Sequence, residues 1–386
     1  MKHAGRPLWL VGFRPFFILA CLSGMSLPVL WALIFNGLIA PPQTSFSMIQ
    51  WHAHEMFFGF GWAVLGGFLL TATKNWVQVR GYHDGALKFL VAAWFFERAG
   101  MWFQADWPSW LFLLSNNLFL VSIVAMIVAT LIRNRKTDNY RDNYFFLLIL
   151  PAFLAAKHLM LDADTMQLGW SMAIGLFRMA FLVMLERTLT QFMGNAFQVS
   201  ILRHTTLDGA IKLLGLALVL VGLMPPGFAV AAALLLALLL AIRLAFWKPL
   251  LALRRLDIGI MVLGYLAIVA QLLIVALDRV AHPHWIGAVS VHVFALGVIG
   301  LIVPAMLIRI SNGHTGRKVV FVRADKLALW LMMLAFVLRV IAPQLYPGAY
   351  GDWIALTAAC WFSCFALLGW RYLPMLLRAR IDGKEH

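Results

Sequence analysis

The stretch from Trp51 to Trp76, WHAHEMFFGFGWAVLGGFLLTATKNW, places two histidines and a glutamate at the start of an apolar run. The run is long enough for a helix that crosses a bilayer, which needs about 20 apolar residues. Lipid supplies neither water nor counter-ions, so ionisable groups at membrane depth are costly and usually serve a ligand, a metal or a proton path. The stretch therefore predicts a membrane helix that carries a functional site.

The two histidines of this stretch are expected to serve different purposes. His52 and His54 point to nearly opposite sides of a regular helix, because two residues correspond to a rotation of about 200°. His52 shares a face with Glu55, whereas His54 shares one with Phe58. The spacing indicates two adjoining sites, or one ligand and one supporting histidine. The simpler alternative is that both histidines cap a helix at the wet interface of the membrane.

The composition of the chain is that of a polytopic membrane protein. Of its 386 residues, 63% are hydrophobic and only 12% are charged, whereas globular proteins have about 25% charged residues. The net charge of +15 would suit nucleic acid, but the basic residues are scattered through short loops between apolar spans, where they encode membrane topology. We therefore exclude nucleic acid as a partner and expect membrane lipids to surround the chain.

Hydropathy predicts an all-α bundle of about twelve transmembrane helices. No linker or low-complexity stretch separates a soluble domain, so we expect a single polytopic transmembrane domain over residues 1–386. The sequence shows no clear internal repeat. The expected spans lie near residues 12–36, 50–73, 87–105, 108–132, 143–161, 166–188, 208–224, 227–247, 256–277, 284–310, 325–342 and 352–377.

The distribution of lysine and arginine predicts the orientation of these spans. Basic residues mark alternate loops and both termini, whereas the loops 37–49, 162–165, 225–226 and 343–351 contain none. By the positive-inside rule both termini are cytoplasmic, which agrees with an even number of spans. Six histidines then fall at the outer ends of spans, namely His52, His54, His158, His282, His284 and His292. This convergence favours a site at the outer face.

His292 is the counterpart of His54 in the expected tenth span. It lies well inside the apolar segment and is followed by Gly297 and Gly300, which allow a helix or a flat macrocycle to approach closely. A hydrogen bond across helices is the structural alternative. Since His54 has a similar depth, we predict that His292 is a metal ligand, and His158 is a further candidate. Neutral imidazole suits iron and copper, and haem iron takes histidine as an axial ligand.

Charged residues inside the apolar spans form a second group of candidates. Arg98, Arg178 and Arg339 are expected to bind an anionic group, and haem propionates fit because guanidinium forks match carboxylates. The structural alternative is an ion pair between Glu97 and one of the other two arginines, Arg178 or Arg339. Glu55 and Glu97 are also candidates for a proton relay.

Two further sequence features bear on ligands. The chain has no C-x-x-C-H motif, so any haem is held without a covalent bond to cysteine. The segment Arg309–Arg317, RISNGHTGR, combines glycines with basic residues. It could form an anion-binding turn, or a loop that fixes the end of a helix.

Several of these motifs together resemble the NnrS family of bacterial inner-membrane proteins. The matching segments are FRPFF at Phe13–Phe17, WHAHEMFFGF and GFLLTATKNW in the second span, and His292 through Gly297 and Gly300 to GHTGR at Gly313–Arg317. The resemblance implies a twelve-helix protein that contains haem b and copper and is associated with denitrification and with tolerance of nitric oxide. It implies no established reaction.

A fainter similarity of arrangement links the chain to the catalytic subunit of haem–copper oxidases. That subunit also has twelve helices, with histidines near the outer ends of its second and tenth spans ligating one haem. By this analogy His54 and His292 are expected to bind haem from facing helices, with His52 and His158 nearer the copper. Nitric oxide is the expected gaseous ligand.

Three functional hypotheses remain open at the level of the sequence. The first is a haem and copper protein of the inner membrane that handles nitric oxide near the periplasmic face. The second is a secondary transporter, with related halves and a charged midplane site around Glu97, Arg98 and Arg178. The third is a nitric oxide reductase or an oxidase-like enzyme, which requires an electron donor and a proton route.

Overall fold

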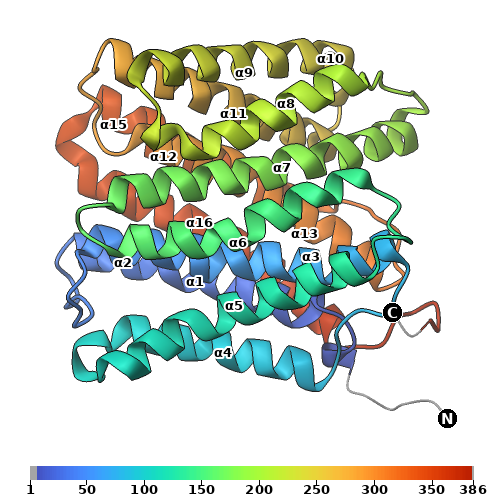
Figure 1. Cartoon of the computed structure of the whole chain (residues 1–386), viewed down its shortest axis with the longest axis horizontal. Helices are drawn as coiled ribbons and strands as arrows, with labels where there is room; N and C mark the ends of the chain where they lie inside the picture. The colour runs from blue at the N-terminus through green and yellow to red at the C-terminus, as the bar shows by residue number, and fades with distance from the viewer. Residues whose placement is uncertain (1–6, 385–386) are drawn as a thin grey trace. The chain divides into compact units, whose positions relative to one another are not determined.

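The computed structural model describes residues 7–384, and within this range the chain is helical and contains no strand (Figure 1). Eleven helical stretches in this range are long and apolar enough to cross a membrane. The expected third span is α4 (Gly85–Trp102), which falls outside this set because Lys88, Glu97 and Arg98 interrupt its apolar sequence. The prediction of an all-α membrane bundle is confirmed, and the chain is a multi-pass membrane protein. The cytoplasmic location of both termini stays a prediction.

Internal contacts divide the chain into two compact units. Unit 1 comprises the described residues of Met1–Gly169, Met306–Val320 and Phe365–His386, and unit 2 comprises Trp170–Ala305 and Phe321–Cys364. Three long helices contribute residues to both units, namely α7 (Met166–Phe197), α13 (Leu301–His314) and α16 (Tyr350–Leu376).

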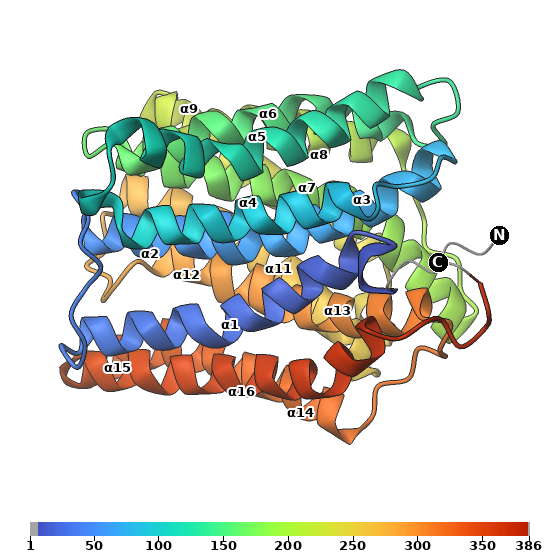
Figure 2. The same ribbon diagram turned by 90° about the horizontal axis from the view of Figure 1, so that it is seen from below.

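Unit 1 contains the helices of the first five expected spans. Its elements are η1 (Pro7–Trp9), α1 (Phe13–Phe35), α2 (Met48–His54), η2 (Glu55–Gly61), α3 (Trp62–Val77), α4, η3 (Gln104–Asp106), α5 (Ser109–Arg133), η4 (Arg141–Asn143) and α6 (Tyr144–Leu161). Glycines allow α1 to pack closely: a Cβ atom added to Gly67 of α3 would lie 2.6 Å from the Cβ atom of Phe16, and one added to Gly24 would lie 2.8 Å from the ring of Phe365 in α16. Figure 2 shows α1 beside α16.

The start of α2 is held in place by hydrogen bonds at both ends of a capping box. The Ser47 hydroxyl accepts a hydrogen bond from the Gln50 backbone N–H, and the Ser47 N–H donates to the Gln50 side chain. The same glutamine donates from Nε2 to the Leu161 carbonyl, 2.9 Å away, at the end of α6. This contact positions the first turn of α2 against α6, and His54 follows one turn later.

Unit 2 contains most of the remaining elements. They are α8 (Thr205–Ala217), η5 (Leu218–Leu223), α9 (Pro226–Phe246), α10 (Pro249–Ala252), α11 (Leu256–Val280), α12 (Val289–His292), η6 (Val293–Gly300), α14 (Arg323–Phe336), η7 (Val337–Ile341), α15 (Ala342–Leu345) and η8 (Pro347–Ala349). The helix formed by α8 and η5 is kinked at Leu220, whose φ and ψ of −96° and 25° are not helical. This kink leaves carbonyl groups available to side chains.

Three of the expected regular helices contain a turn of π-helix. The segment η2 follows directly after His54, η6 follows directly after His292, and η7 contains Arg339. Regular α-helical periodicity does not indicate these π turns. In η2 and η6, Gly59 and Gly297 weaken the α-helical preference and let neighbouring side chains approach, whereas η7 contains no glycine. Short π segments of this kind occur frequently at functional sites.

The two units repeat the same local order around these histidines. In unit 1, α1 precedes the histidine helix and α4 follows it with Arg98; in unit 2, α11 precedes the histidine helix and α14 with η7 follows it with Arg339. Each histidine has a glycine five residues later, Gly59 or Gly297. A Cβ atom on Gly297 would lie 2.7 Å from Ala267 of α11 and 2.9 Å from Phe336 of α14. The shared spacing of histidine and glycine is present in the sequence, but the π segment after each histidine is seen only in the structure.

The contact between α6 and α7 gives a test of the packing of unit 1. A Cβ atom on Gly169 would lie 2.5 Å from the Met160 Cα atom, and neither backbone can move away cheaply. We expect Gly169→Ala to lower the free energy of unfolding by at least about 2 kcal/mol, as overpacking does. The matched control is Gly209→Ala in α8, which meets no atom within 4 Å. Thermal unfolding of the purified protein compares them, and equal stability of both variants would contradict this packing.

Candidate functional site

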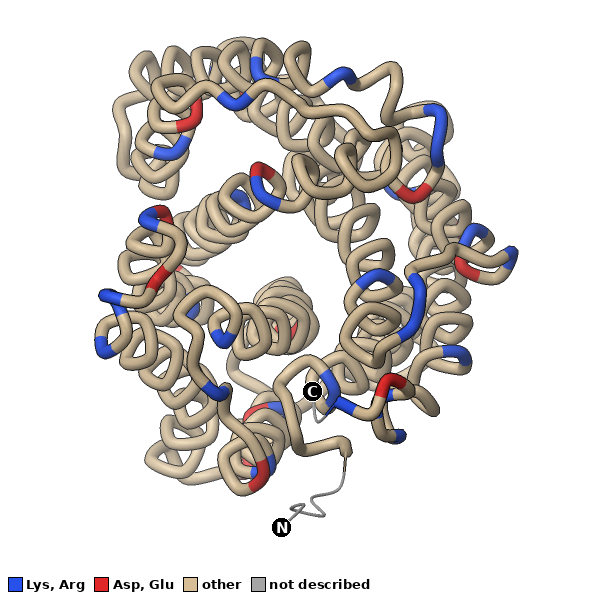
Figure 3. The backbone as a smooth tube through the Cα atoms, turned by 90° about the vertical axis from the view of Figure 1, so that its right-hand side faces the viewer, with Lys and Arg blue, Asp and Glu red and all other residues tan. Residues whose placement is uncertain are grey.

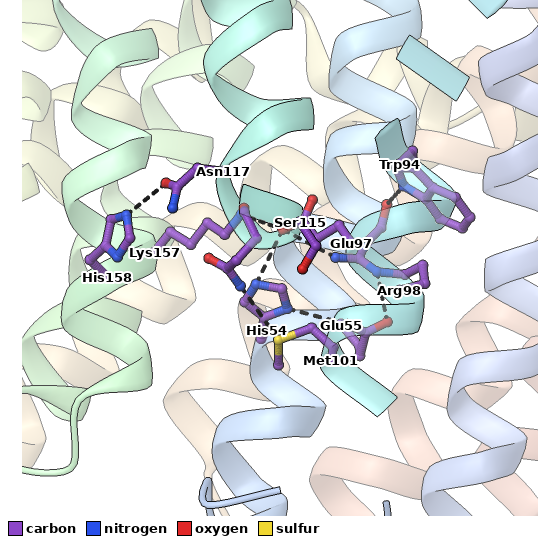
Figure 4. A network of polar contacts seen from close by, with 12 residues as sticks. His54, Glu55, Trp94, Glu97, Arg98, Met101, Ser115, Asn117, Lys157 and His158 are labelled. Carbon is purple, nitrogen blue, oxygen red and sulfur yellow. Dashed lines mark hydrogen bonds and ion pairs between the residues drawn. The ribbon is translucent and has the colours of Figure 1, made fainter. Parts of the chain in front are cut away.

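His54 is fully buried at the junction of α2 and η2, where it belongs to a group of polar side chains in unit 1 (Figure 4). Its Nδ1 atom lies 3.2 Å from Glu55 Oε1. Its Nε2 atom lies 3.4 Å from Glu97 Oε1 but makes no hydrogen bond there. One imidazole nitrogen is therefore anchored by a carboxylate, whereas the other is buried without a hydrogen-bond partner.

Glu97 of α4 is the point at which the polar side chains converge. Its Oε1 atom contacts the Lys157 ammonium group from α6 and lies 3.3 Å from Arg98 Nη2. The Lys157 ammonium also donates to the Asn116 carbonyl of α5. Glu97 and Lys157 are both at most 1% exposed. Figure 4 shows these side chains extending from separate helices toward one another.

Arg98 joins the same group through the second carboxylate. Its Nε atom lies 3.1 Å from Glu55 Oε2, within ion-pair distance but without hydrogen-bond geometry. Its guanidinium carbon lies 5.3 Å from the centre of the Trp94 ring, and the Trp94 Nε1–H donates to the Gly59 carbonyl inside the π segment. A side chain on Gly59 would collide with the guanidinium. The glycine of the π segment thus allows Arg98 to reach Glu55.

The charges of this polar cluster, defined as His54, Glu55, Glu97, Arg98 and Lys157, balance one another. Two carboxylates oppose two cations, so the net charge is −2 + 2 = 0 with a neutral imidazole. Balance is required because burying an unpaired ion in a low-dielectric interior costs a desolvation free energy of roughly several kcal/mol. The arrangement offers chemistry of two kinds: ligand binding at the His54 Nε2 atom, and proton exchange among the imidazole, the carboxylates and the ammonium group.

The other two histidines predicted in unit 1 have different surroundings. His52 stacks on Trp31, with ring centres 4.2 Å apart and planes inclined by 19°. His158 is exposed on α6, and its Nε2 atom lies 2.8 Å from Asn117 Oδ1. Its neighbour Lys157 enters the polar cluster instead. Within residues 7–384, no three His, Cys, Asp or Glu side chains form a group ready to hold a metal ion.

The predicted site residues of unit 2 have neutral partners. His292 Nδ1 lies 2.8 Å from the Ala288 carbonyl, which requires the proton on Nδ1 and leaves the lone pair on Nε2. Arg178 donates to Gln271 Oε1 at 3.0 Å and to the Leu218 carbonyl at the start of the kinked segment. Arg339 donates to the Tyr350 hydroxyl at 3.0 Å.

The alternative ion pair of Glu97 with one of these two arginines is not what the structure shows. Glu97 is paired with Lys157 and Arg98. Neither Arg178 nor Arg339 forms an ion pair within residues 7–384.

Sequence reasoning passed over two sets of buried charges. Lys157 lies near the end of a span, directly before His158, and its position in the span was the available signal because ionisable residues in spans are rare. The second set, in unit 2, links α7, α8 and α9: Glu186 contacts Arg203 and lies 2.9 Å from Lys212 Nζ, and Arg243 lies 3.4 Å from Asp208. The Asp208 and Lys212 spacing of one helical turn was its available signal.

Removal of Lys157 tests the charge balance of the polar cluster. We expect Lys157→Met to lower the free energy of unfolding by about 3–5 kcal/mol, because it leaves Glu97 buried beside one cation fewer. The double variant Lys157→Met with Glu97→Gln restores neutrality and should cost less than the sum of the single variants, by about 0.5–3 kcal/mol. An exposed lysine in the loop after α5 supplies the matched control, Lys136→Met, with an expected change within about 0.5 kcal/mol. Additive effects in denaturant titrations would refute the coupling.

Comparison with known proteins agrees with the motifs. No curated protein matches the sequence. The family described as NnrS protein matches residues 7–380, which is nearly the whole described chain. This match includes the FRPFF segment, both histidine helices and the GHTGR segment. The chain therefore belongs to the NnrS family, a family of membrane proteins of the nitric oxide response.

Proposed function

We propose that the protein is a haem b protein of the bacterial inner membrane that binds nitric oxide and acts in nitrosative-stress tolerance or denitrification. His54 and His292 are the residues that would hold haem iron, each through its imidazole. Haem iron, when bound, would supply an electron-exchanging centre with affinity for diatomic gases. The proposal rests mainly on one observation, the buried His54 Nε2 atom without a hydrogen-bond partner.

The contact made by the other ring nitrogen of His54, Nδ1, also fits a metal ligand. Histidines that bind metals commonly donate the other ring N–H to a carboxylate, which fixes the tautomer and raises the basicity of the ligating nitrogen. Glu55 Oε1 has this position relative to Nδ1. Binding at Nε2 requires Glu97 to turn away from that nitrogen, and its bonds to Lys157 and Arg98 offer it alternative partners.

His292 also has one ring nitrogen anchored by a hydrogen bond, but its partner is a backbone carbonyl and not a carboxylate. Its Nδ1–H donates to a backbone carbonyl, so the Nε2 atom carries the lone pair. It directly precedes a π segment, as His54 does. The shared local structure supports the proposal that both imidazoles have the same role, namely axial ligation of haem.

The arginines divide into two groups with respect to haem propionates. The charge of Arg98 is balanced by Glu55 and Glu97. Arg98 is therefore a positioning residue for these carboxylates. Arg178 and Arg339 are buried and their partners are neutral. We therefore assign the propionate-binding role to Arg178 and Arg339, because buried guanidinium groups favour an anionic partner.

Copper is the second proposed metal, with His52 and His158 as its candidate ligands. Both histidines have other contacts, His52 with Trp31 and His158 with Asn117, so copper would require these side chains to rearrange. Glu55 and Glu97 are the proposed proton carriers, because Glu97 contacts both His54 and Lys157 and Glu55 contacts the other ring nitrogen of His54.

The ligand assignment is tested by the optical spectrum of the purified protein. We expect His54→Ala and His292→Ala each to lose or change the haem spectrum, because each removes an imidazole that would hold the iron. His83→Ala, in the loop before α4, is the matched control and should retain the haem of the wild type. Unchanged haem content and an unchanged spectrum in both site variants would overturn the assignment.

The same preparations separate binding from the competing functions. Nitric oxide added to the reduced protein should change the spectrum of the wild type and of His83→Ala alike. Continuous loss of nitric oxide with a reductant present would extend the proposal to enzymatic turnover. Saturable uptake of a solute by metal-free protein in vesicles would replace it by transport.

A further inference from the structure

Two motifs that the proposed function leaves unexplained meet at the end of unit 1 where α1 begins. The Phe13 ring of the FRPFF segment lies 5.3 Å from the His314 ring of the GHTGR segment. The chain after α16 passes the same place, because the Ile381 N–H donates to the Thr315 carbonyl. A turn with a positive φ of 81° at Gly316 closes the GHTGR segment. Three distant parts of the sequence therefore form one structure here.

Arg14 is the buried centre of this structure. It is 0% exposed, and its Nη1 atom donates to the carbonyls of Leu376 and Arg378 at 2.7 and 2.6 Å. Its Nε and Nη2 atoms are buried and have no hydrogen-bond partner. The carbonyls at the end of α16 carry partial negative charge and offset one cation in part. They leave two strong donors of the guanidinium unused.

Two more arginines add positive charge at the same place. Arg317 directly follows Gly316 in the turn of the GHTGR segment, and Arg380 directly precedes Ile381, whose N–H donates to the Thr315 carbonyl. The Nη1 atom of Arg317 is also buried without a hydrogen-bond partner. Arg380 donates to the His314 carbonyl at 2.9 Å and holds Asp382 through two hydrogen bonds.

Asp382 does not neutralise this group of arginines. Its hydrogen bonds with Arg380 lower the pKa of the carboxyl group to about 2, so it is ionised at neutral pH and engaged by that arginine. It is the single acidic residue among the described residues 306–320 and 365–384. The same segments contain seven basic residues, Arg309, Arg317, Lys318, Arg371, Arg378, Arg380 and Lys384. Figure 3 marks the Lys and Arg positions in blue and the Asp and Glu positions in red along the backbone.

We propose that Arg14 and Arg317 bind a phosphate group at this end of unit 1, with Arg380 adding to the positive potential. An anion would satisfy the unused N–H groups of Arg14 and Arg317 and offset the positive charges of these two side chains. Guanidinium forks match the geometry of phosphate oxygens, and basic pockets at the ends of membrane helices bind lipid head groups. The phosphate belongs either to an anionic phospholipid or to free inorganic phosphate.

Binding to the purified full-length protein tests the proposal and distinguishes the two sources. Inorganic phosphate is titrated against chloride at equal ionic strength, with the melting temperature as readout. Phosphatidylglycerol is compared with phosphatidylcholine by native mass spectrometry of the lipid that remains bound. Preference for phosphate over chloride assigns free phosphate, and preference for phosphatidylglycerol assigns a head group.

Charge variants complete the experiment. Arg317→Gln should weaken the preferred ligand about tenfold or more, as expected for loss of a hydrogen bond to a charged group. Arg14→Gln should do the same if it folds. The matched control is Arg255→Gln in unit 2, where the arginine is 47% exposed and paired with Asp257, and its affinity should equal that of the wild type.

Two results would overturn the phosphate site: no preference for either ligand over its control, or wild-type affinity in Arg317→Gln. Haem content of Arg317→Gln should be unchanged, so this outcome is independent of the proposed haem function.

Discussion

Burial of charge in a medium without water is the constraint on which unit 1 depends. Glu97 and Lys157 are almost fully buried inside helices of a membrane bundle, and neither is tolerable there alone. Each offsets the desolvation cost of burying the other. Arg98 and Glu55 form a second ion pair, so the four side chains together are a neutral set. Because these four residues come from η2, α4 and α6, charge neutrality holds three helices in one register.

This neutral set also prepares His54 for a ligand. The Glu55 carboxylate is held by Arg98 on one oxygen and contacts the imidazole with the other. The imidazole is therefore oriented by a group that is itself oriented. Preorganisation of this kind lowers the entropy cost of binding, since the ligand atom is already directed. The polar cluster thus stabilises unit 1 and also orients the His54 Nε2 atom for a ligand.

The π segments explain how adjacent residues along the chain cooperate at one place. In a regular α-helix, residues one apart diverge by about 100°. At the junction with η2, both His54 and Glu55 face the polar cluster, and the Gly59 carbonyl accepts a hydrogen bond from Trp94. A π segment also follows directly after His292. The π geometry therefore accompanies both histidines and is not a peculiarity of one helix.

Family motifs acquire distinct physical meanings in this structure. The second-span motif supplies His54, Glu55 and Gly59 to the polar cluster. The FRPFF and GHTGR segments belong to the opposite type of environment, in which arginines cluster without enough acid. The first motif belongs to a neutral cluster whose charges are paired, whereas the other two leave N–H donors unused. This difference separates the proposed haem function from the proposed phosphate site.

The sequence by itself determined the membrane class and the NnrS family, and it singled out His54, Glu55, Glu97 and Arg98. These follow from hydropathy, from the rarity of charge in apolar segments and from local motif spacing, which are properties of the chain read in order. Only the tertiary structure decided that Glu97 pairs with Lys157 and that Lys157, not His158, enters the polar cluster. Partner choice depends on how helices distant in sequence rotate against one another, and the π segments change that rotation in a way that α-helical periodicity does not encode.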